Sequence, residues 1–293
     1  MKIFDVKNNI NLANYTSIKV GGYTEYFVEP CNKTQLLECL NWAKIKKLRY
    51  RIIGAGSNLL INNTFHEGLT ICTKKLKKIE LDSASGLIKA ECGVMLPFIA
   101  NLLAKNACQG GEWLIGIPGT IGGAIFMNAG TGSFWISNHL LSVEAIDLKN
   151  LKIYNIKMKD LDFGYRLSSF QTNNLTILSA KFSFIPNKNP KEITETTKEN
   201  LKRKTENQPY HLPSFGSVFK NPKNNYAGKL IEGVGLKGFK IGGAQVSTMH
   251  SNFIVNNSNA TSDNIYQLIT VIQQKVQQKT GIFLHPEVRM IGY

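Results

Sequence analysis

The segment from Gly116 to Gly130, GIPGTIGGAIFMNAG, constrains the fold more than any other part of the sequence. It has glycine at five of its fifteen positions and carries no charged side chain. Glycine costs backbone entropy and fills no core volume, so a run this rich in it is a poor component of an ordinary core. We interpret it as backbone that lies closely against a large ligand, with bare N–H groups that suit phosphates. A glycine-rich turn between two buried strands remains an open alternative on this segment alone.

A second glycine loop, Gly54-Ala-Gly-Ser-Asn58, lies between two apolar runs. It does not match the dinucleotide fingerprint GxGxxG, because the third glycine would fall at Leu59 and a strand rather than a helix is expected to follow. The sequence also lacks the GK[ST] of a phosphate-binding P-loop. A hairpin-like turn is the plain alternative. Together, however, the two loops predict two anion-binding segments in one half of the chain, as a dinucleotide cofactor with two phosphates requires.

Size and composition indicate a globular protein. With 293 residues, 43% hydrophobic and 19% charged, the chain is expected to form two or three domains. Its five cysteines show no CxxC spacing and its histidines form no ligand pair, which argues for reduced thiols and against a disulfide framework or any metal site. No apolar run is long enough to span a membrane, and the N-terminus does not resemble a signal peptide. We therefore expect a cytoplasmic protein.

The net charge of +15 predicts anionic partners. Lysines gather at 74–78 and 202–204, but aromatic residues are not interleaved with them as in nucleic-acid-binding surfaces. We therefore expect small anionic ligands rather than nucleic acid.

The spacing of apolar residues predicts a mixed α and β organisation. Residues 16–30 are typical of two short strands with a turn, and residues 50–62 of strand, glycine loop and strand. Helices are expected over 34–46, at about 97–106, and over 261–279, where Gly281 would end the helix. The polar stretch 187–209 predicts a solvated helical connector. We divide the chain into 1–72 (with 288–293 as a candidate addition), 73–190, the connector 191–205, and 206–287.

Eight motifs carry a resemblance to one enzyme family. In chain order they are GAGSNLL, GIPGTIGGAIFMNAG, FGYRLSSF, GSVFKNP, AGKLIE, GGAQVS, HSNFIVN and LHPEVRMIG. They closely resemble the UDP-N-acetylenolpyruvoylglucosamine reductases (MurB), and the resemblance runs from about Tyr15 to Gly292. The resemblance implies an α+β protein: a two-part FAD-binding domain like that of the vanillyl-alcohol oxidases (PCMH type), here 1–72 and 73–190, plus a C-terminal α+β substrate-binding domain, here 206–287. It also implies that NADPH and FAD reduce the enolpyruvyl ether of UDP-N-acetylglucosamine to UDP-N-acetylmuramate in peptidoglycan synthesis.

The resemblance identifies three catalytic residues whose chemistry suits that reaction. A hydride added to the enolpyruvyl double bond leaves negative charge on the neighbouring carbon and its carboxylate. Arg166, in FGYRLSSF, offers a fixed positive fork for that charge, and Glu287, in LHPEVRMIG, would assist beside it. Ser217, in FGSVFKNP, would donate the proton, since a strongly basic carbon can take one even from a weak acid. Without the resemblance, Arg166 and Glu287 are typical of ion-pair residues and Ser217 of a turn; His285 is interpreted as a bystander.

The resemblance further implies a set of binding residues. Gly119–Gly123 would lie near the FAD diphosphate and Asn128–Gly130 towards the flavin. The full FAD set is Gly54, Ala55, Gly56, Ser57, Asn58, Gly116, Pro118, Gly119, Thr120, Gly122, Gly123, Asn128 and Gly130. The substrate set is Tyr165, Lys220, Asn221, Gln245 and Asn252. The expected partners are the enolpyruvyl UDP-sugar and NADPH, with no nucleic acid, no membrane and a monomeric chain.

The chain departs from the family pattern at three places. Tyr15 stands where the family often has histidine, and TGSFWISNHL (131–140) replaces the usual glycine-containing segment. The short run after Phe170 leaves no room for the tyrosine-bearing lid loop, which indicates the shorter (type II) branch. Two rival functions are open. The first is a flavin oxidase of the same fold, which is disfavoured because no histidine for a covalent flavin tether lies between His66 and His139. The second is a basic nucleic-acid-binding module, which leaves the glycine loops unexplained.

Overall fold

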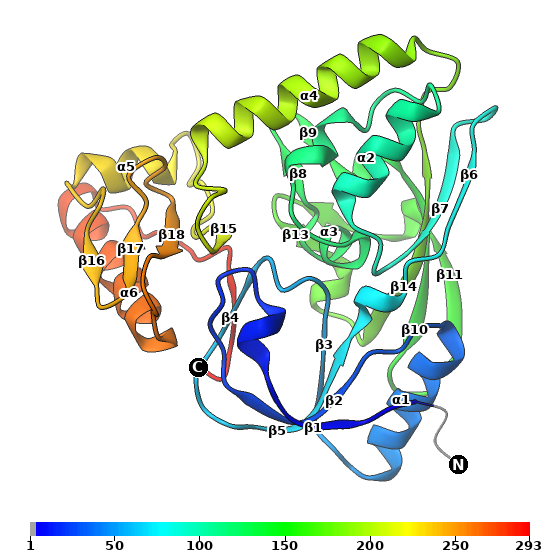
Figure 1. Ribbon diagram of the computed structural model, residues 1–293, viewed down its shortest axis with the longest axis horizontal. Helices are drawn as coiled ribbons and strands as arrows, with labels where there is room; N and C mark the ends of the chain where they lie inside the picture. The colour runs from blue at the N-terminus through cyan, green and yellow to red at the C-terminus, as the bar shows by residue number, and fades with distance from the viewer. Residues whose placement is uncertain (1–3) are drawn as a thin grey trace. The chain divides into compact units, whose positions relative to one another are not determined.

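The computed structural model describes residues 4–293 (Figure 1). The chain forms two compact units, each assembled from separated segments. The first unit comprises the residues up to Lys7, Tyr26–Ala55 and Gly68–Arg203, and the second comprises Asn8–Glu25, Gly56–Glu67 and Lys204–Tyr293. The division into cofactor subdomains, connector and substrate domain stays a prediction, and its residues 1–3 lie outside the described residues.

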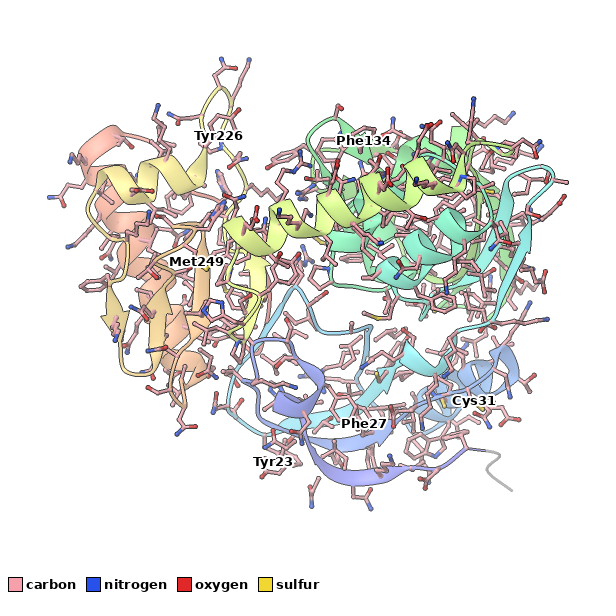
Figure 2. All side chains as sticks on the ribbon, turned by 45° about the horizontal axis from the view of Figure 1, so that its top comes forward. Tyr23, Phe27, Cys31, Phe134, Tyr226 and Met249 are labelled. Carbon is pink, nitrogen blue, oxygen red and sulfur yellow. The ribbon has the colours of Figure 1, made fainter. Side chains whose placement is uncertain are left out.

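A four-stranded sheet with the order β1-β2-β5-β3 is formed early in the chain. β3 and β5 are parallel, with Tyr50 opposite Leu69. The N-cap of α1 is Asn32, whose side chain accepts a hydrogen bond from the Gln35 N–H at 2.9 Å. In β2, Phe27 is buried and Tyr23 is half exposed (Figure 2). The helix α1 (Lys33–Ile45) confirms the one expected over 34–46. The strands are β1 (Lys7–Asn11), β2 (Tyr23–Val28), β3 (Tyr50–Ile53) and β5 (His66–Cys72).

The prediction of two strands over residues 16–30 is wrong for the first strand. Only β2 forms there, and the residues between the 3₁₀ turn Leu12–Tyr15 and β2 carry no strand. The reason is a local side-chain bond. The Thr16 hydroxyl donates to the Val20 carbonyl at 2.8 Å and accepts from the Val20 N–H at 3.2 Å. Such a side-chain loop competes with strand pairing for the same backbone groups.

The first unit also contains a five-stranded antiparallel sheet, with the order β11-β10-β14-β7-β6. Ala145 of β10 lies opposite Ile177, and Ala180 of β14 lies opposite Ala90. A core cluster of buried residues from this sheet, α1, α2 and the glycine-rich segment fills the unit. The helix α2 (Leu96–Lys105) confirms the one expected at about 97–106. The strands are β6 (Ile79–Asp82), β7 (Leu87–Glu91), β10 (Leu140–Asp147), β11 (Ile153–Lys157) and β14 (Leu175–Ser183).

The glycine-rich segment 116–130 is neither a simple turn nor a pair of strands. A 3₁₀ turn (Glu112–Gly116) leads into a short helix, α3 (Ile121–Met127). Thr120 is its N-cap, and Asn128 ends it in the left-handed conformation with φ of 43°. The alternation of glycine and bulky apolar residues concealed this helix, because Gly122 and Gly123 weaken intrinsic helix propensity. Two small hairpins follow: β8 (Gly130–Thr131) with β9 (Phe134–Trp135), and β12 (Phe163–Gly164) with β13 (Leu167–Ser168).

The polar stretch after the five-stranded sheet forms one long helix, α4 (Pro190–Asn207), as predicted for the connector. Of its residues only Ile193 and Thr197 are buried. The helix is therefore solvated along most of its length.

The second unit contains a four-stranded sheet of order β15-β18-β17-β16, with α5 (Ala227–Gly233) and α6 (Ser262–Thr280). Its own core cluster includes the apolar stripe of α6, and Gly281 ends that helix with φ of 72°, as predicted. A separate parallel pair joins β4 (Leu59–Ile61) to the C-terminal β19 (Arg289–Ile291). The other strands are β15 (Ser214–Ser217), β16 (Lys240–Ile241), β17 (Ala244–Val246) and β18 (Phe253–Asn256). No helix of residues 4–293 has the length and apolarity that crossing a membrane requires.

Candidate active site

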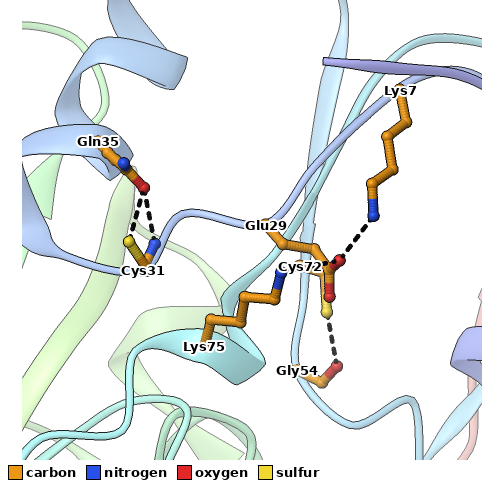
Figure 3. Close-up of polar contacts among 7 residues, drawn as sticks. All are labelled: Lys7, Glu29, Cys31, Gln35, Gly54, Cys72 and Lys75. Carbon is orange, nitrogen blue, oxygen red and sulfur yellow. Dashed lines mark hydrogen bonds and ion pairs between the residues drawn. The ribbon is translucent and has the colours of Figure 1, made fainter. Parts of the chain in front are cut away.

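The two glycine loops meet inside the first unit. A Cβ added to Gly54 would lie 2.5 Å from the Thr120 hydroxyl, so only glycine permits this approach. The Cys72 thiol donates a hydrogen bond to the Gly54 carbonyl in the first loop, at 3.7 Å (Figure 3). Cys92 supports the second, since a Cβ on Gly122 would lie 2.9 Å from the Cys92 Cβ. The two loops therefore pack against each other at Gly54 and Thr120, whereas their role in binding anions stays a prediction.

Several backbone N–H groups of the second loop already have acceptors in the protein. The Ile121 N–H donates to the Val94 carbonyl and the Gly122 N–H to the Cys92 carbonyl, both at 2.8 Å. The Gly123 N–H donates weakly to the Thr120 hydroxyl at 3.4 Å. The expectation of bare N–H groups is thus wrong for Ile121 and Gly122. Here the glycines provide room for close approach rather than a set of phosphate donors.

The rest of the first loop belongs to the second unit. Gly56 has φ of 67°, and its carbonyl accepts from the Ser17 N–H at 3.2 Å. The Asn58 side chain donates to the Glu287 carbonyl at 3.1 Å, and the Asn58 carbonyl accepts from the Arg289 N–H at 3.0 Å. Asn58, predicted to bind cofactor, therefore fixes the backbone of the predicted catalytic glutamate.

Asn128 has one polar atom with no bond inside the described part of the chain. The residue is 4% exposed, and its side-chain N–H donates to the Gly164 carbonyl at 2.9 Å. Its Oδ1 is buried without a protein donor. A buried acceptor left unpaired costs about 1–3 kcal/mol, so a ligand that donates a hydrogen bond here is favoured. This atom and the close contact between Gly54 and Thr120 fit a flat, hydrogen-bonding cofactor such as FAD.

Arg166 occupies the tip of the hairpin formed by β12 and β13. The two-residue loop is Tyr165-Arg166, and Arg166 has φ of 56°, a left-handed conformation that usually favours glycine or asparagine. Its guanidinium donates to the Gly130 carbonyl at 3.2 Å. Gln171 donates to the Arg166 carbonyl at 3.1 Å and to the Phe126 carbonyl at 2.7 Å. The hairpin is thus fastened to α3 and to the residues that follow it.

Ser217 and Glu287 are brought together within the second unit. Ser217 ends β15, where the register with β18 shifts and the preceding Gly216 has φ of 79°. Such a bulge redirects a side chain relative to its strand. Directly after it, the Val218 carbonyl accepts from the Glu287 N–H at 2.8 Å. The predicted proton donor and the predicted glutamate therefore lie on adjacent backbone segments.

Three of the predicted substrate residues use their side-chain amides to bond backbone groups, and Lys220 is held through its own backbone N–H. Asn252 is buried, and its amide bonds both backbone groups of Phe219, at 2.9 and 3.0 Å. Asn221 accepts from the Ala227 N–H at 3.0 Å, and Gln245 donates to the Gly238 carbonyl at 3.0 Å. Lys220 is held by its N–H, which donates to the His285 carbonyl at 2.9 Å. The amide residues act on the backbone, and direct contact of this set with substrate stays a prediction.

Sequence profiles and known proteins agree on one family. Residues 24–155 match the family described as FAD binding domain, and residues 208–291 match UDP-N-acetylenolpyruvoylglucosamine reductase, C-terminal domain. A UDP-N-acetylenolpyruvoylglucosamine reductase from Prochlorococcus marinus subsp. pastoris is 62% identical over 293 residues, covering 100% of this chain and 99% of the relative. The chain belongs to the UDP-N-acetylenolpyruvoylglucosamine reductase family. A second reductase of that name, from Prochlorococcus marinus strain MIT 9313, is 45% identical over 97% of this chain and 92% of its own.

A solved structure supports the same assignment to the UDP-N-acetylenolpyruvoylglucosamine reductase family. The crystal structure of MurB from Thermus caldophilus superposes with a TM-score of 0.83 at 28% identity, covering 99% of this chain and all of that one. The predicted family and α+β fold class are confirmed, as are FAD as cofactor and the class of flavoprotein oxidoreductase.

Sequence reasoning missed residues that act through their neighbours. Trp135 and Gln171 contact Arg166, and Cys72 and Cys92 support the glycine loops. Of these four residues, only Trp135 is marked in the sequence itself, because it lies in the segment 131–140 that departs from the family pattern. The others are recognisable only once the fold brings distant segments together.

Proposed function

We propose that this protein catalyses the reaction of its family, the NADPH-driven reduction of the enolpyruvyl ether of UDP-N-acetylglucosamine to UDP-N-acetylmuramate. The support for the activity is similarity over the whole length of the chain to reductases of that name. The observation that carries the site assignment is the bond from the Glu287 N–H to the Val218 carbonyl, which joins Glu287 to the residue after Ser217. The product identifies the pathway as peptidoglycan synthesis.

FAD is held by the two glycine loops in this proposal. When bound, FAD would supply the hydride chemistry that links oxidation of NADPH to reduction of the enolpyruvyl double bond. Gly54 and Gly122 keep the loops closely packed, and the Asn128 Oδ1 offers a buried acceptor to the cofactor. The loop residues from Gly54 to Asn58 and from Gly116 to Gly130 together form the proposed binding set.

Arg166 binds the carboxylate of the enolpyruvyl group. Its guanidinium can offer two parallel N–H donors, the geometry that suits a carboxylate as charge accumulates on it. Because the guanidinium is fixed to the Gly130 carbonyl before substrate arrives, little reorganisation is needed during the reaction.

Ser217 and Glu287 complete the addition. Hydride goes to one carbon of the double bond, and the Ser217 hydroxyl gives a proton to the neighbouring carbon and recovers one from solvent. Glu287, on the adjacent backbone segment, orients the hydroxyl and balances the local charge. Arg166 belongs to the first unit, whereas Ser217 and Glu287 belong to the second.

Further features support the finer parts of the proposal. Only residues 172–174 separate the 3₁₀ turn Ser169–Gln171 from β14, which begins at Leu175, and this short connection supports the shorter branch without a lid loop. All five cysteines are free, as in a reducing cytoplasm, where the substrates NADPH and UDP-sugars are found. We infer a cytoplasmic enzyme whose basic surface favours two polyanionic ligands.

Stopped-flow absorbance tests the function in two steps. The purified protein should show a flavin spectrum that bleaches on mixing with NADPH and returns, without oxygen, on addition of the enolpyruvyl UDP-sugar. Absence of flavin would exclude the proposal. Reoxidation by oxygen with an alcohol as reductant, and none by the UDP-sugar, would favour an oxidase of the same fold instead.

A further inference from the structure

The hairpin that carries Arg166 holds this side chain at a conformational cost. In its two-residue loop only Arg166 has positive φ, so it stands at the turn position where glycine avoids strain. A left-handed conformation is strained for a residue that carries a Cβ. Strain of this kind persists where surrounding contacts hold the residue in place. The contacts around Arg166 therefore indicate what the strained loop is for.

Two aromatic rings flank the guanidinium. The Arg166 Cζ lies 5.4 Å from the ring centre of Trp135 and 5.3 Å from that of Tyr165. The two rings meet edge to face, with centres 5.8 Å apart and planes at 88°. A cation within about 6 Å of a ring centre is attracted by its negative face. The guanidinium is held on two sides by rings and on a third by the Gly130 carbonyl.

Gly130 allows Trp135 to reach this position. The two residues are paired across the β8–β9 hairpin, and a Cβ on Gly130 would lie 2.6 Å from the Trp135 ring. The missing side chain lets the indole lie over the backbone of Gly130, whose carbonyl binds the guanidinium. The neighbouring Phe134 faces elsewhere: it is 52% exposed and stacks on Trp113 (Figure 2).

We propose that Trp135 is a positioning residue, which with the Gly130 carbonyl and the Tyr165 ring holds the Arg166 guanidinium ready for the substrate carboxylate. This inference rests on the proposed role of Arg166. In this proposal Trp135 takes no chemical part in the reaction. Its effect is to keep a long side chain, otherwise free to adopt many rotamers, in one orientation before substrate binds.

The experiment compares the two half-reactions by stopped flow. In Trp135→Leu the guanidinium loses one ring face, and flavin reoxidation by the enolpyruvyl UDP-sugar should slow about tenfold, while reduction by NADPH changes less than about twofold. Trp135→Phe should restore reoxidation to within about threefold of the wild type, because a ring face returns. Phe134→Leu, on the same hairpin, is the matched control and should leave both rates unchanged. Equal slowing of both half-reactions in Trp135→Leu, or unchanged reoxidation, would overturn the proposal.

A double-mutant cycle separates this inference from the proposed function. In an Arg166→Ala background, Trp135→Leu should have no further effect on reoxidation, because there is no guanidinium left to position. Equal effects of Trp135→Leu in both backgrounds would overturn the positioning role alone. An Arg166→Ala enzyme with normal reoxidation would instead contradict the proposed function of Arg166. If Trp135→Leu does not retain FAD and a cooperative thermal transition, Trp135→Met replaces it in the same cycle with the same expected results.

Discussion

Arg166 and Ser217 are held in place by different means. Arg166 sits on a small hairpin whose position depends on side chains: two rings, and the amide of Gln171. Ser217 sits at a strand end whose position depends on backbone bonds, since Val218 accepts from Glu287 and Lys220 donates to His285. The first arrangement tolerates little change in neighbouring side chains, whereas the second depends on few of them. The exception near Ser217 is the Asn252 side chain, which bonds the backbone of Phe219.

The side-chain amides of Gln171 and Asn252 make the contrast between the surroundings of Arg166 and Ser217 testable. Gln171 uses its N–H groups to bond the carbonyls of Arg166 and Phe126 and is partly exposed to solvent. Asn252 uses both its N–H and its carbonyl on Phe219, and it is 3% exposed. Water can replace the partners of Gln171 more readily than those of Asn252.

The largest effect is expected at Ser217 itself. Ser217→Ala should slow reoxidation by the enolpyruvyl UDP-sugar by about 10²–10⁴-fold, the usual loss on removing a general acid, and should leave FAD binding and NADPH reduction intact. Ser214→Ala, at the start of the same strand, is the matched control and should behave like the wild type. Loss of the NADPH step in Ser217→Ala would contradict the proton-donor role.

The next effect compares the two amides. Asn252→Leu leaves the buried N–H and carbonyl of Phe219 without partners and should lower the free energy of unfolding by about 3 kcal/mol, measured by urea titration. Gln171→Leu should lower it by only about 1 kcal/mol. Its main effect should be slower reoxidation, because the strained Arg166 backbone loses a tether.

The exposed Asn257 provides the control for both variants, since Asn257→Leu should change stability by less than about 0.5 kcal/mol. Equal destabilisation by Asn252→Leu and Gln171→Leu would contradict the distinction between Ser217, which is positioned by backbone bonds, and Arg166, which is positioned by side chains.

A smaller effect tests the contact of the glycine segment with cofactor. A Cβ on Gly123 would lie 3.6 Å from the Thr120 hydroxyl, an ordinary contact, and the residue is exposed in α3. Gly123→Ala should therefore stabilise the FAD-free protein by up to about 1 kcal/mol, yet weaken FAD binding if the cofactor lies on this segment. Gly54→Ala should destabilise the FAD-free protein, because its Cβ would meet Thr120. Unchanged FAD affinity in Gly123→Ala would show that the cofactor does not lie on this segment.

The mildest test uses the thiols, all of which belong to the first unit. Burial raises the pKa of Cys39 and of Cys92 to about 12, and it also raises the pKa of Cys72 and Cys108. Only Cys31 is exposed, so one thiol should react rapidly with a disulfide reagent at pH 8 and four only on unfolding. Asn252→Leu, in the second unit, should leave this pattern unchanged. Rapid labelling of a buried thiol in that variant would show that the two units unfold together.

The sequence by itself determined the local elements and the family. The apolar stripe of α6 and its terminal Gly281 follow from helical periodicity and the need for positive φ, so they were predictable from neighbours in sequence. The eight motifs likewise identified the enzyme family and its catalytic residues as candidates. By contrast, Thr16 closing a loop and the helix α3 were not predictable, because single side-chain bonds and tertiary packing overrode the propensity of those segments.

Only the tertiary structure decided how the proposed site residues are held. The Gly116–Gly130 segment indicated close approach to something large, and the fold shows that Thr120 meets Gly54 there while Asn128 keeps a buried acceptor. Asn58 holding Glu287, Asn252 holding Phe219 and Trp135 flanking Arg166 each join residues far apart in sequence or on separate hairpins. A motif specifies which side chain is present, but its orientation depends on long-range contacts that no local pattern encodes.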